Sequence, residues 1–334
     1  MQTTEQSTGK RILNWIGYRF THGSMNFSLG IALVVVSIIL TILSNVFLTV
    51  TNFTNILVNC SIAAILAAGA TVAMLLGGMD ISQYSLVALV GMVAAKLMEQ
   101  GKYPLWLAGF VIPLLVAIAC GTFNGILVGY VRIIPVITTM GMMQVYRGIC
   151  YIICNAQTCM ITNNSFRFIG RYYIFGLIPV SVLIMVLVYL VTGYMLKYTS
   201  FGRKVFSVGG NKQASHLSGI DTRRTIAMGM LWSSLCAGVA ALVYAARLGA
   251  ASPTAGEGSE MTVMASVILG GISLSGGKGK LSGTILGVLL IALIENGLTL
   301  MLVQSFYKTI VNGAILIIAV TIDLVRTNVY KKSS

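Results

Sequence analysis

The chain has 334 residues, of which 57% are apolar and 9% are charged, and its formal net charge is +14. A typical soluble domain is about 25% charged, because charged side chains must cover the surface that faces water. This composition therefore excludes an ordinary soluble protein and favours one whose solvent is largely lipid. The basic residues lie between apolar runs, which indicates the positive-inside rule of membrane proteins rather than binding to nucleic acid.

The predicted elements begin after a polar and basic stretch, 1–26, which we expect to be a cytoplasmic N-terminal segment. It is not a cleavable signal peptide, because the apolar run that follows is too long for one. That run, 27–47, carries no formal charge and has the roughly 20 residues that cross a hydrocarbon core. Barrel strands alternate in polarity and this run does not, so we predict that it is helical.

Ten apolar segments of this kind follow one another along the chain. Their ranges are 27–47, 53–75, 82–99, 104–131, 135–154, 174–196, 225–247, 260–272, 281–302 and 305–324. We therefore predict an all-α, polytopic membrane protein with about ten transmembrane segments. They form one domain, 27–325, and a cytoplasmic tail, 326–334, follows it.

Two of these segments are irregular. The segment 104–131 contains Pro113 and Gly121, at which we expect interruptions, and the segment 260–272 is short. Broken, short or re-entrant helices at membrane depth usually line a cavity, because their free backbone groups need polar partners.

An even number of crossings places both termini on one side of the membrane. That side receives most of the 22 Lys and Arg residues, namely Lys10, Arg11, Arg19, Arg132, Lys197, Arg203, Lys204, Lys212, Arg223, Arg224, Lys278, Lys280, Arg326, Lys331 and Lys332. Basic residues concentrate on the cytoplasmic side of membrane proteins. We therefore predict that both termini and the long loop 197–224 are cytoplasmic.

Motifs for conventional catalysis are missing from the sequence. There is no Ser-His-acid pattern, no metal-binding His-Glu-x-x-His motif and no phosphate-binding G-x-x-x-x-G-K-[ST] loop. The six cysteines are scattered, and no further ligands are spaced to complete a metal site around Cys150 and Cys154. We expect no catalytic site, no metal and no cofactor in this chain.

Polar residues inside the apolar segments are costly and usually face the interior of a bundle. The ionisable ones are Asp80, Arg147, Glu260 and Glu295, and the amides are Asn59, Asn124, Gln144 and Asn296. They have two interpretations, a hydrated pathway for a polar solute or hydrogen-bonded contacts between helices. Our candidates for the wall or gate of a pathway are Asn124, Gln144, Glu295 and Asn296.

The two longest loops carry further candidates. In the cytoplasmic loop 197–224, Asn211 can cap a short helix from Lys212 to Leu217, which Ser218-Gly219 would end. Such a helix is suited to docking a partner; otherwise the loop is simply a basic segment held at lipid headgroups. The outer loop 155–173 carries Arg167 and Arg171.

Three blocks of sequence resemble a known family. They read GGMDISQYSLVALVGMVAA at 77–95, GTFNGILVGYVRIIPVITTMGMMQVYRGI at 121–149 and FGRKVFSVGGNKQASHLSGI at 201–220, the last continuing through 256–287 to NGLTLM at 296–301. From about residue 50 to 325 the chain resembles the inner-membrane permease subunits of bacterial ABC sugar importers, in particular the ribose-type branch.

The resemblance implies an architecture and a set of partners. Such permeases pair, as two copies or as two sister chains, and form a pore in the bacterial inner membrane. A cytoplasmic ATPase binds ATP and Mg and drives the pore, and a periplasmic protein delivers the sugar.

The resemblance also assigns residues. The loop block corresponds to the helix that couples the permease to the ATPase, here Arg203, Asn211, Lys212, Gln213, Ala214, Ser215, His216, Leu217, Gly219 and Arg223. Arg167 and Arg171 are candidates to meet acidic patches on the binding protein.

The chain departs from the family pattern at two places. The first block usually reads GGIDLSVGS, and here Gln83-Tyr84 stands where Val-Gly is usual. The coupling segment usually carries Pro-Glu-Ala-Ala after its Asn, and here it reads Lys212-Gln213-Ala214-Ser215. The sequence does not identify the sugar. Two other functions also stay open: a proton- or ion-coupled transporter with Asp80 and Glu295 as proton sites, and a membrane scaffold that transports nothing.

Overall fold

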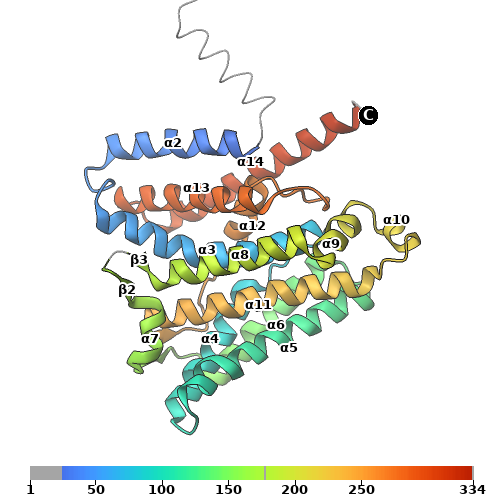
Figure 1. Cartoon of the computed structure of the whole chain (residues 1–334). Coiled ribbons are helices and arrows are strands. Elements are labelled where there is room, and N and C mark those ends of the chain that lie inside the picture. Colours follow the sequence, from blue (N-terminus) through green and yellow to red (C-terminus); the bar gives the residue numbers. More distant parts are fainter. Residues whose placement is uncertain (1–24, 177, 333–334) are drawn as a thin grey trace, which may run out of the picture.

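The computed structural model describes residues 25–176 and 178–332, with an almost entirely helical architecture (Figure 1). The predicted N-terminal segment, 1–26, lies outside the described residues except for its last two positions. The α-helices are α2 (Met25–Leu43), α3 (Val50–Leu75), α4 (Gln83–Gln100), α5 (Ile112–Gly125), α6 (Pro135–Cys154), α7 (Asn164–Arg171), α8 (Val180–Tyr198), α9 (Ser200–Gly210), α10 (Lys212–Leu217), α11 (Thr222–Leu248), α12 (Glu260–Leu269), α13 (Leu281–Leu300) and α14 (Ser305–Lys332).

Within the described residues, seven helices are long and apolar enough to cross a membrane. They are α2, α3, the continuous helix Leu107–Tyr130, α6, α8, α11 and α13. The multi-pass helical membrane protein predicted above is thereby confirmed in outline. The remaining three predicted segments are helical as α4, α12 and α14, and the number of ten crossings stays a prediction.

The outer faces of several helices are apolar and exposed. Ile42 on α2 and Ile152 on α6 are each 78% exposed, and Leu190 on α8 is 65% exposed. A soluble protein rarely exposes such continuous apolar surface, whereas lipid chains solvate it without cost. These faces account for the low charge content of the chain.

Helix α3 lies at the centre of the bundle and contacts α8, α11, α12 and α13. Its middle is made of small buried residues, among them Ala64, Ala67 and Ala70, which are fully buried. At Gly69 an added Cβ would lie 2.8 Å from the Cβ of Cys236 on α11. Small residues let two helix backbones approach closely, which is the main source of packing energy between helices in lipid.

The 27 residues of α11 span about 40 Å, close to the thickness of a bilayer with its headgroups. The start of α11 lies beside α10, and its end lies beside α7 (Figure 1). We call these two ends of the bundle the α10 end and the α7 end.

The helix at 104–131 corrects one prediction. It runs without a break through Gly121, because Gly121 packs on α11 and an added Cβ would lie 2.7 Å from the Cβ of Ser234. The expected interruption there is wrong. Pro113 follows a π-helical turn, η1 (Leu107–Val111), and a second one, η2 (Ile126–Tyr130), follows α5. These wide turns accommodate local irregularity inside one continuous helix.

Four very short strands and one helix lie at the α7 end, where no such elements were predicted. Strand β1 (Cys159–Met160) pairs antiparallel with β4 (Ala250–Ala251), and β2 (Tyr173–Ile174) pairs antiparallel with β3 (Ile178–Pro179). The first pair fastens the loop after α6 to the end of α11.

Candidate functional site

A cavity of about 590 Å³ opens at the α7 end. We call it the outer cavity, because the distribution of basic residues predicts that the loop 155–173, which contains α7, lies outside. Its walls come from α3, α4, α11, α12, α13, α14 and the loop before α12. The polar and charged residues of the wall are Asn52, Asn55, Asn59, Tyr84, Tyr244, Arg247, Glu257, Ser259, Thr262, Ser266, Glu295, Asn296, Thr299, Lys308, Thr309 and Asn312. A cavity of this size and polarity suits a small hydrophilic solute.

The charged side chains of the wall balance one another. Arg247 and Lys308 are basic, and Glu257 and Glu295 are acidic. Arg247 donates from Nη1 to the Oδ1 of Asn59 at 2.7 Å. Neutral side chains are also the partners of two other charged groups. Glu295 accepts from Asn312 Nδ2 at 2.9 Å, and Lys308 donates to Thr299 Oγ1 at 2.9 Å. The wall therefore has no formal excess of either charge.

Two amides tie α3 to α13 at the cavity wall. Asn52 Nδ2 donates to Asn296 Oδ1 at 3.1 Å, and Asn296 Nδ2 donates back to Asn52 Oδ1 at 2.8 Å. Asn52 is 5% exposed and also donates to the carbonyl of Phe47. This reciprocal pair leaves few rotamers open to either side chain, so the wall is preorganised.

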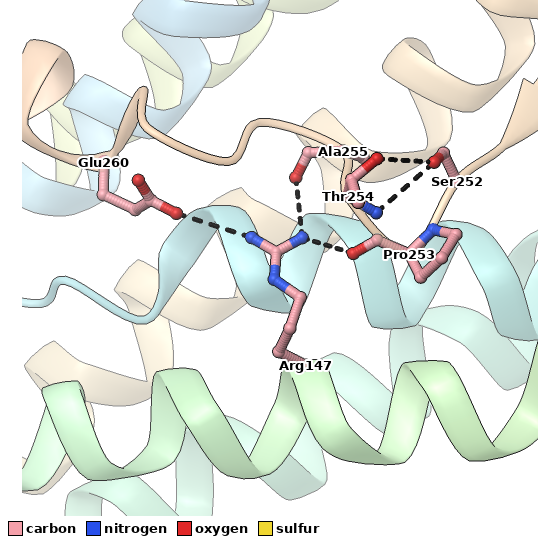
Figure 2. Close-up of polar contacts among 6 residues, drawn as sticks. All are labelled: Arg147, Ser252, Pro253, Thr254, Ala255 and Glu260. Carbon is pink, nitrogen blue, oxygen red and sulfur yellow. Dashed lines mark hydrogen bonds and ion pairs between the residues drawn. The ribbon is translucent and has the colours of Figure 1, made fainter. Parts of the chain in front are cut away.

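The loop before α12 is held by a guanidinium from α6 (Figure 2). Arg147 is 8% exposed, and its Nη1 donates to the carbonyls of Pro253 and Ala255. Its Nη2 lies 3.4 Å from Oε1 of Glu260. Because the next residues, 257–259, line the outer cavity, Arg147 positions one wall of the cavity from the opposite side of the loop.

A second polar cluster is closed to solvent. Asp80 accepts from Ser233 Oγ at Oδ2 and from Ser82 Oγ at Oδ1, both at 2.6 Å. Asn124 Nδ2 donates to Ser82 Oγ at 3.1 Å, and Tyr146 donates to Asn124 Oδ1 at 3.0 Å. All five side chains are at most 2% exposed. The cluster joins the start of α4 to α5, α6 and α11, which is the helix-to-helix role considered for such residues.

The structure separates the residues predicted for the wall or gate. Glu295 and Asn296 line the outer cavity. Asn124 belongs to the closed cluster, and Gln144 lies on an exposed face of α6. Asp80 does not line the cavity, so Asp80 and Glu295 do not share it.

The sequence prediction missed several wall residues, including Arg247, Lys308 and Asn312. One signal could have found part of the wall. Asn52, Asn55 and Asn59 recur at helical spacing in an apolar segment, which places them on one face of a helix.

The α10 end carries the short helix predicted between Asn211 and Gly219, and that helix is confirmed. Asn211 Oδ1 accepts from the backbone N–H of Ala214 at 2.9 Å, and Gly219 has φ +80°. Ser215 is buried and lies 2.9 Å from Ser207 Oγ of α9, which fastens α10 to α9. Leu217 is 87% exposed.

The predicted coupling residues lie mostly on the surface. Among them, Ser215 is buried, and the others are exposed: Arg203, Asn211, Lys212, Gln213, Ala214, His216, Leu217, Gly219 and Arg223. A groove of about 740 Å³ separates α10 and the start of α11 from the segment 128–135. Three basic side chains, Arg132, Lys212 and Arg223, and one acidic side chain, Asp221, line this groove, so it carries an excess of positive charge.

Three glycine segments meet behind this groove, and we call their meeting point the glycine junction. Gly209, near the end of α9, lies so close to the carbonyl of Leu75 that no Cβ fits there. Gly277 donates its N–H to the same carbonyl at 2.8 Å. An added Cβ at Gly276 would lie 2.8 Å from the backbone nitrogen of Gly77. Backbone therefore packs on backbone between α9, the end of α3 and the loop before α13.

The two arginines predicted to meet a binding protein lie on α7. Arg171 is exposed, and its guanidinium donates to the carbonyls of Arg247 and Leu248 at 2.9 and 2.8 Å. It therefore caps the end of α11, where a cation is favoured by the helix dipole. Arg167 is partly buried beside Gly249.

Comparisons with known proteins place the chain among transport proteins. Residues 52–320 match the family described as the branched-chain amino acid transport system permease component. The chain is 39% identical to the D-allose transport system permease protein AlsC of Escherichia coli (strain K12), covering 83% of this chain and 84% of that one. It is 36% identical to the ribose import permease protein RbsC of Bacillus subtilis (strain 168), covering 97% and 98%. It is 32% identical to the L-arabinose ABC transporter permease protein AraH of Azospirillum brasilense, covering 84% and 82%. No solved structure matches the chain.

Proposed function

Because the chain belongs to the family of branched-chain amino acid transport system permease components, we propose that it is the transmembrane pore subunit of an ABC importer that carries a monosaccharide inward. The observation that carries this proposal is the match to a ribose import permease over 97% of the chain. Relatives named for allose and arabinose extend the match to other monosaccharides. The resemblance to ribose-type sugar permeases that the sequence blocks indicated is thereby confirmed.

The energy for transport comes from a partner ATPase, which binds ATP and Mg and docks at the α10 end. The exposed Leu217 supports this assignment, since burial of a large apolar side chain against a partner is favourable. The basic groove around Arg132, Lys212 and Arg223 would attract acidic groups and speed association. The α10 end is then cytoplasmic, and the α7 end is outside.

The glycine junction is the route by which movement of α10 reaches the membrane. Ser207 and Ser215 fasten α10 to α9, and Gly209 at the end of α9 touches the backbone of α3. A contact between backbones has no flexible side chain to absorb a displacement, so α9 and α3 move as connected rigid bodies. Closure of the ATPase would thus alternate the access of the pore between the two faces.

Two further partners complete the importer. A periplasmic sugar-binding protein docks at the α7 end, where Arg167 and Arg171 supply positive charge. A second permease chain, either another copy or a sister chain, completes the pore in the inner membrane. The broad apolar faces of α2 and α6 are available to lipid and to this second chain.

The test is ATP-driven uptake by the intact importer. The complex is purified with its ATPase, placed in proteoliposomes, and given labelled D-ribose, D-allose or L-arabinose together with the binding protein. We expect uptake of at least one sugar that requires ATP inside and is unaffected by an ionophore. Uptake driven by an imposed proton gradient without ATP would contradict the proposal and return Asp80 and Glu295 to a proton-coupled mechanism.

A further inference from the structure

Tyr84 is the second residue of the pair Gln83-Tyr84, at which the sequence differs from the block that the resemblance described above leads us to expect. Of the pair Gln83-Tyr84, Gln83 turns away from the outer cavity. Its amide donates to the carbonyl of Leu66 and to Ser233 Oγ, both at 3.0 Å. Tyr84 lines the outer cavity and is 9% exposed. Only the second change of the pair therefore alters the cavity.

The ring of Tyr84 forms one wall together with the loop before α12. At Gly256, where φ is +67°, a Cβ would overlap the ring, so ring and loop backbone lie in direct contact. From the other side, Arg147 holds the neighbouring carbonyls of Pro253 and Ala255 (Figure 2). The ring is thereby fixed in place. Within the described part of the chain, its hydroxyl has no hydrogen-bond partner.

The remaining walls offer neutral hydrogen-bonding groups from several directions. Asn55 lines the cavity from α3, Tyr244 from α11, and Ser259 from the loop before α12. The charged groups already balance, and Asn59 engages Arg247. With two basic and two acidic side chains the wall has no formal net charge, and a solute with many hydroxyl groups can exchange hydrogen bonds with its neutral donors and acceptors. A volume of about 590 Å³ lies within the usual range for small-molecule sites.

We propose that the outer cavity is a binding site for a monosaccharide in the permease itself, and that Tyr84 determines the size and orientation of the sugar it admits. A tyrosine offers an apolar ring face for the C–H side of a sugar and a hydroxyl for a hydrogen bond. The sugar then pauses in the permease after its release from the binding protein. This inference rests on the proposed function, because it assigns the solute by the class that the importer carries.

The first test changes Tyr84 in the intact importer, with the binding protein saturated so that its own affinity does not limit the rate. Tyr84→Phe removes one hydrogen bond, and we expect uptake of the transported sugar to fall about fivefold. Tyr84→Gly restores the smaller residue of the family pattern. It widens the cavity, and we expect the ratio of D-allose to D-ribose uptake to rise about fivefold or more. Tyr194→Phe, on an exposed face of α8, is the matched control and should leave both quantities unchanged.

The second test detects the sugar in the cavity directly. In a background with Cys60→Ser, Ser259→Cys places a thiol in the cavity wall and Thr254→Cys places one on the same loop outside it. A membrane-impermeant maleimide is added to the intact importer with and without the transported sugar. We expect the sugar to slow labelling at position 259 about fivefold or more and to leave labelling at position 254 unchanged.

The outcomes separate the two proposals. If the wild-type complex shows no ATP-driven uptake of any of the three sugars, the proposed function fails. If uptake is intact, the Tyr84 variants match wild type in rate and selectivity, and the sugar protects neither thiol, the function stands and the cavity site is overturned.

Discussion

The two ends of α3 are built on opposite principles. Towards the α7 end, Asn52, Asn55 and Asn59 line a cavity with polar side chains. Towards the α10 end, the helix is made of small apolar residues and finishes at Leu75, whose carbonyl packs against the backbone of Gly209. One end of α3 therefore borders a cavity, and the other end is closely packed against neighbouring backbone.

The difference matches two physical tasks. A solute needs a hollow with hydrogen-bonding groups, because burying its hydroxyls without partners is costly. Transmission of a movement needs contacts that do not yield, and backbone against backbone is the stiffest contact available. A single helix, α3, joins the two regions, so in the proposed mechanism a displacement imposed at the glycine junction would be carried to the wall of the outer cavity. The predictions below disturb one end at a time.

The largest effect is expected at Arg147, which holds the cavity loop. Arg147→Met leaves the carbonyls of Pro253 and Ala255 and the partly buried carboxylate of Glu260 without their partner. An unsatisfied buried polar group costs about 1–3 kcal/mol, so with several affected we expect a large fall in the thermal stability of the purified complex and loss of uptake. Arg147→Lys keeps the charge without the planar fork and should recover part of the stability. A stable, fully active Arg147→Met variant would show that Arg147 is not needed to hold the loop before α12.

The glycine junction should give the next largest effect. Gly209→Ala places a methyl group against the carbonyl of Leu75, and overpacking of this kind typically costs about 1–3 kcal/mol. We expect ATP hydrolysis to continue while uptake falls sharply, as measured on the same proteoliposomes. The adjacent Gly210→Ala is the control, since a Cβ there meets nothing within 4 Å. If the two variants had the same rates of uptake and ATP hydrolysis, the glycine junction would not couple the ATPase to the pore.

Leu217 tests the outermost part of the α10 end. Leu217→Ser removes an exposed apolar side chain, so the permease itself should fold as before. Burial of a leucine side chain in a partner contributes about 2 kcal/mol, which corresponds to a roughly 30-fold weaker association with the ATPase when it is lost. Copurification of the two chains at graded dilution measures this. Met228, 44% exposed on α11, provides a comparison as Met228→Ser, and equal losses in both variants would argue against a docking role for Leu217.

The smallest effect is expected at Glu295 in the cavity wall. Glu295→Ala removes the acceptor for Asn312, and a hydrogen bond of this kind contributes about 1–2 kcal/mol. We expect uptake to fall about tenfold while the complex assembles normally, as judged by gel filtration. An unchanged rate would assign Glu295 to packing alone.

Much of the architecture followed from the sequence, because the determinants are local. Apolar runs of sufficient length become helices when backbone groups have no water to bind. The helix Lys212–Leu217 was predictable because Asn211 and Gly219 are its own start and stop signals. The role of Gly121 was not predictable, because it allows close packing on Ser234, which lies more than a hundred residues away in the sequence.

Long-range contacts decided the rest. Asn124 and Asn296 are both amides within apolar segments, and nothing in their neighbouring sequence separates them. In the fold, Asn296 lines the outer cavity, whereas Asn124 is buried in the closed cluster around Asp80. Arg147 likewise meets the carbonyls of Pro253 and Ala255 only after α6 has packed beside that loop. The sequence shows that a polar residue in a membrane segment requires a hydrogen-bonding partner. Only the packing of distant helices determines whether that partner is another side chain or a solute.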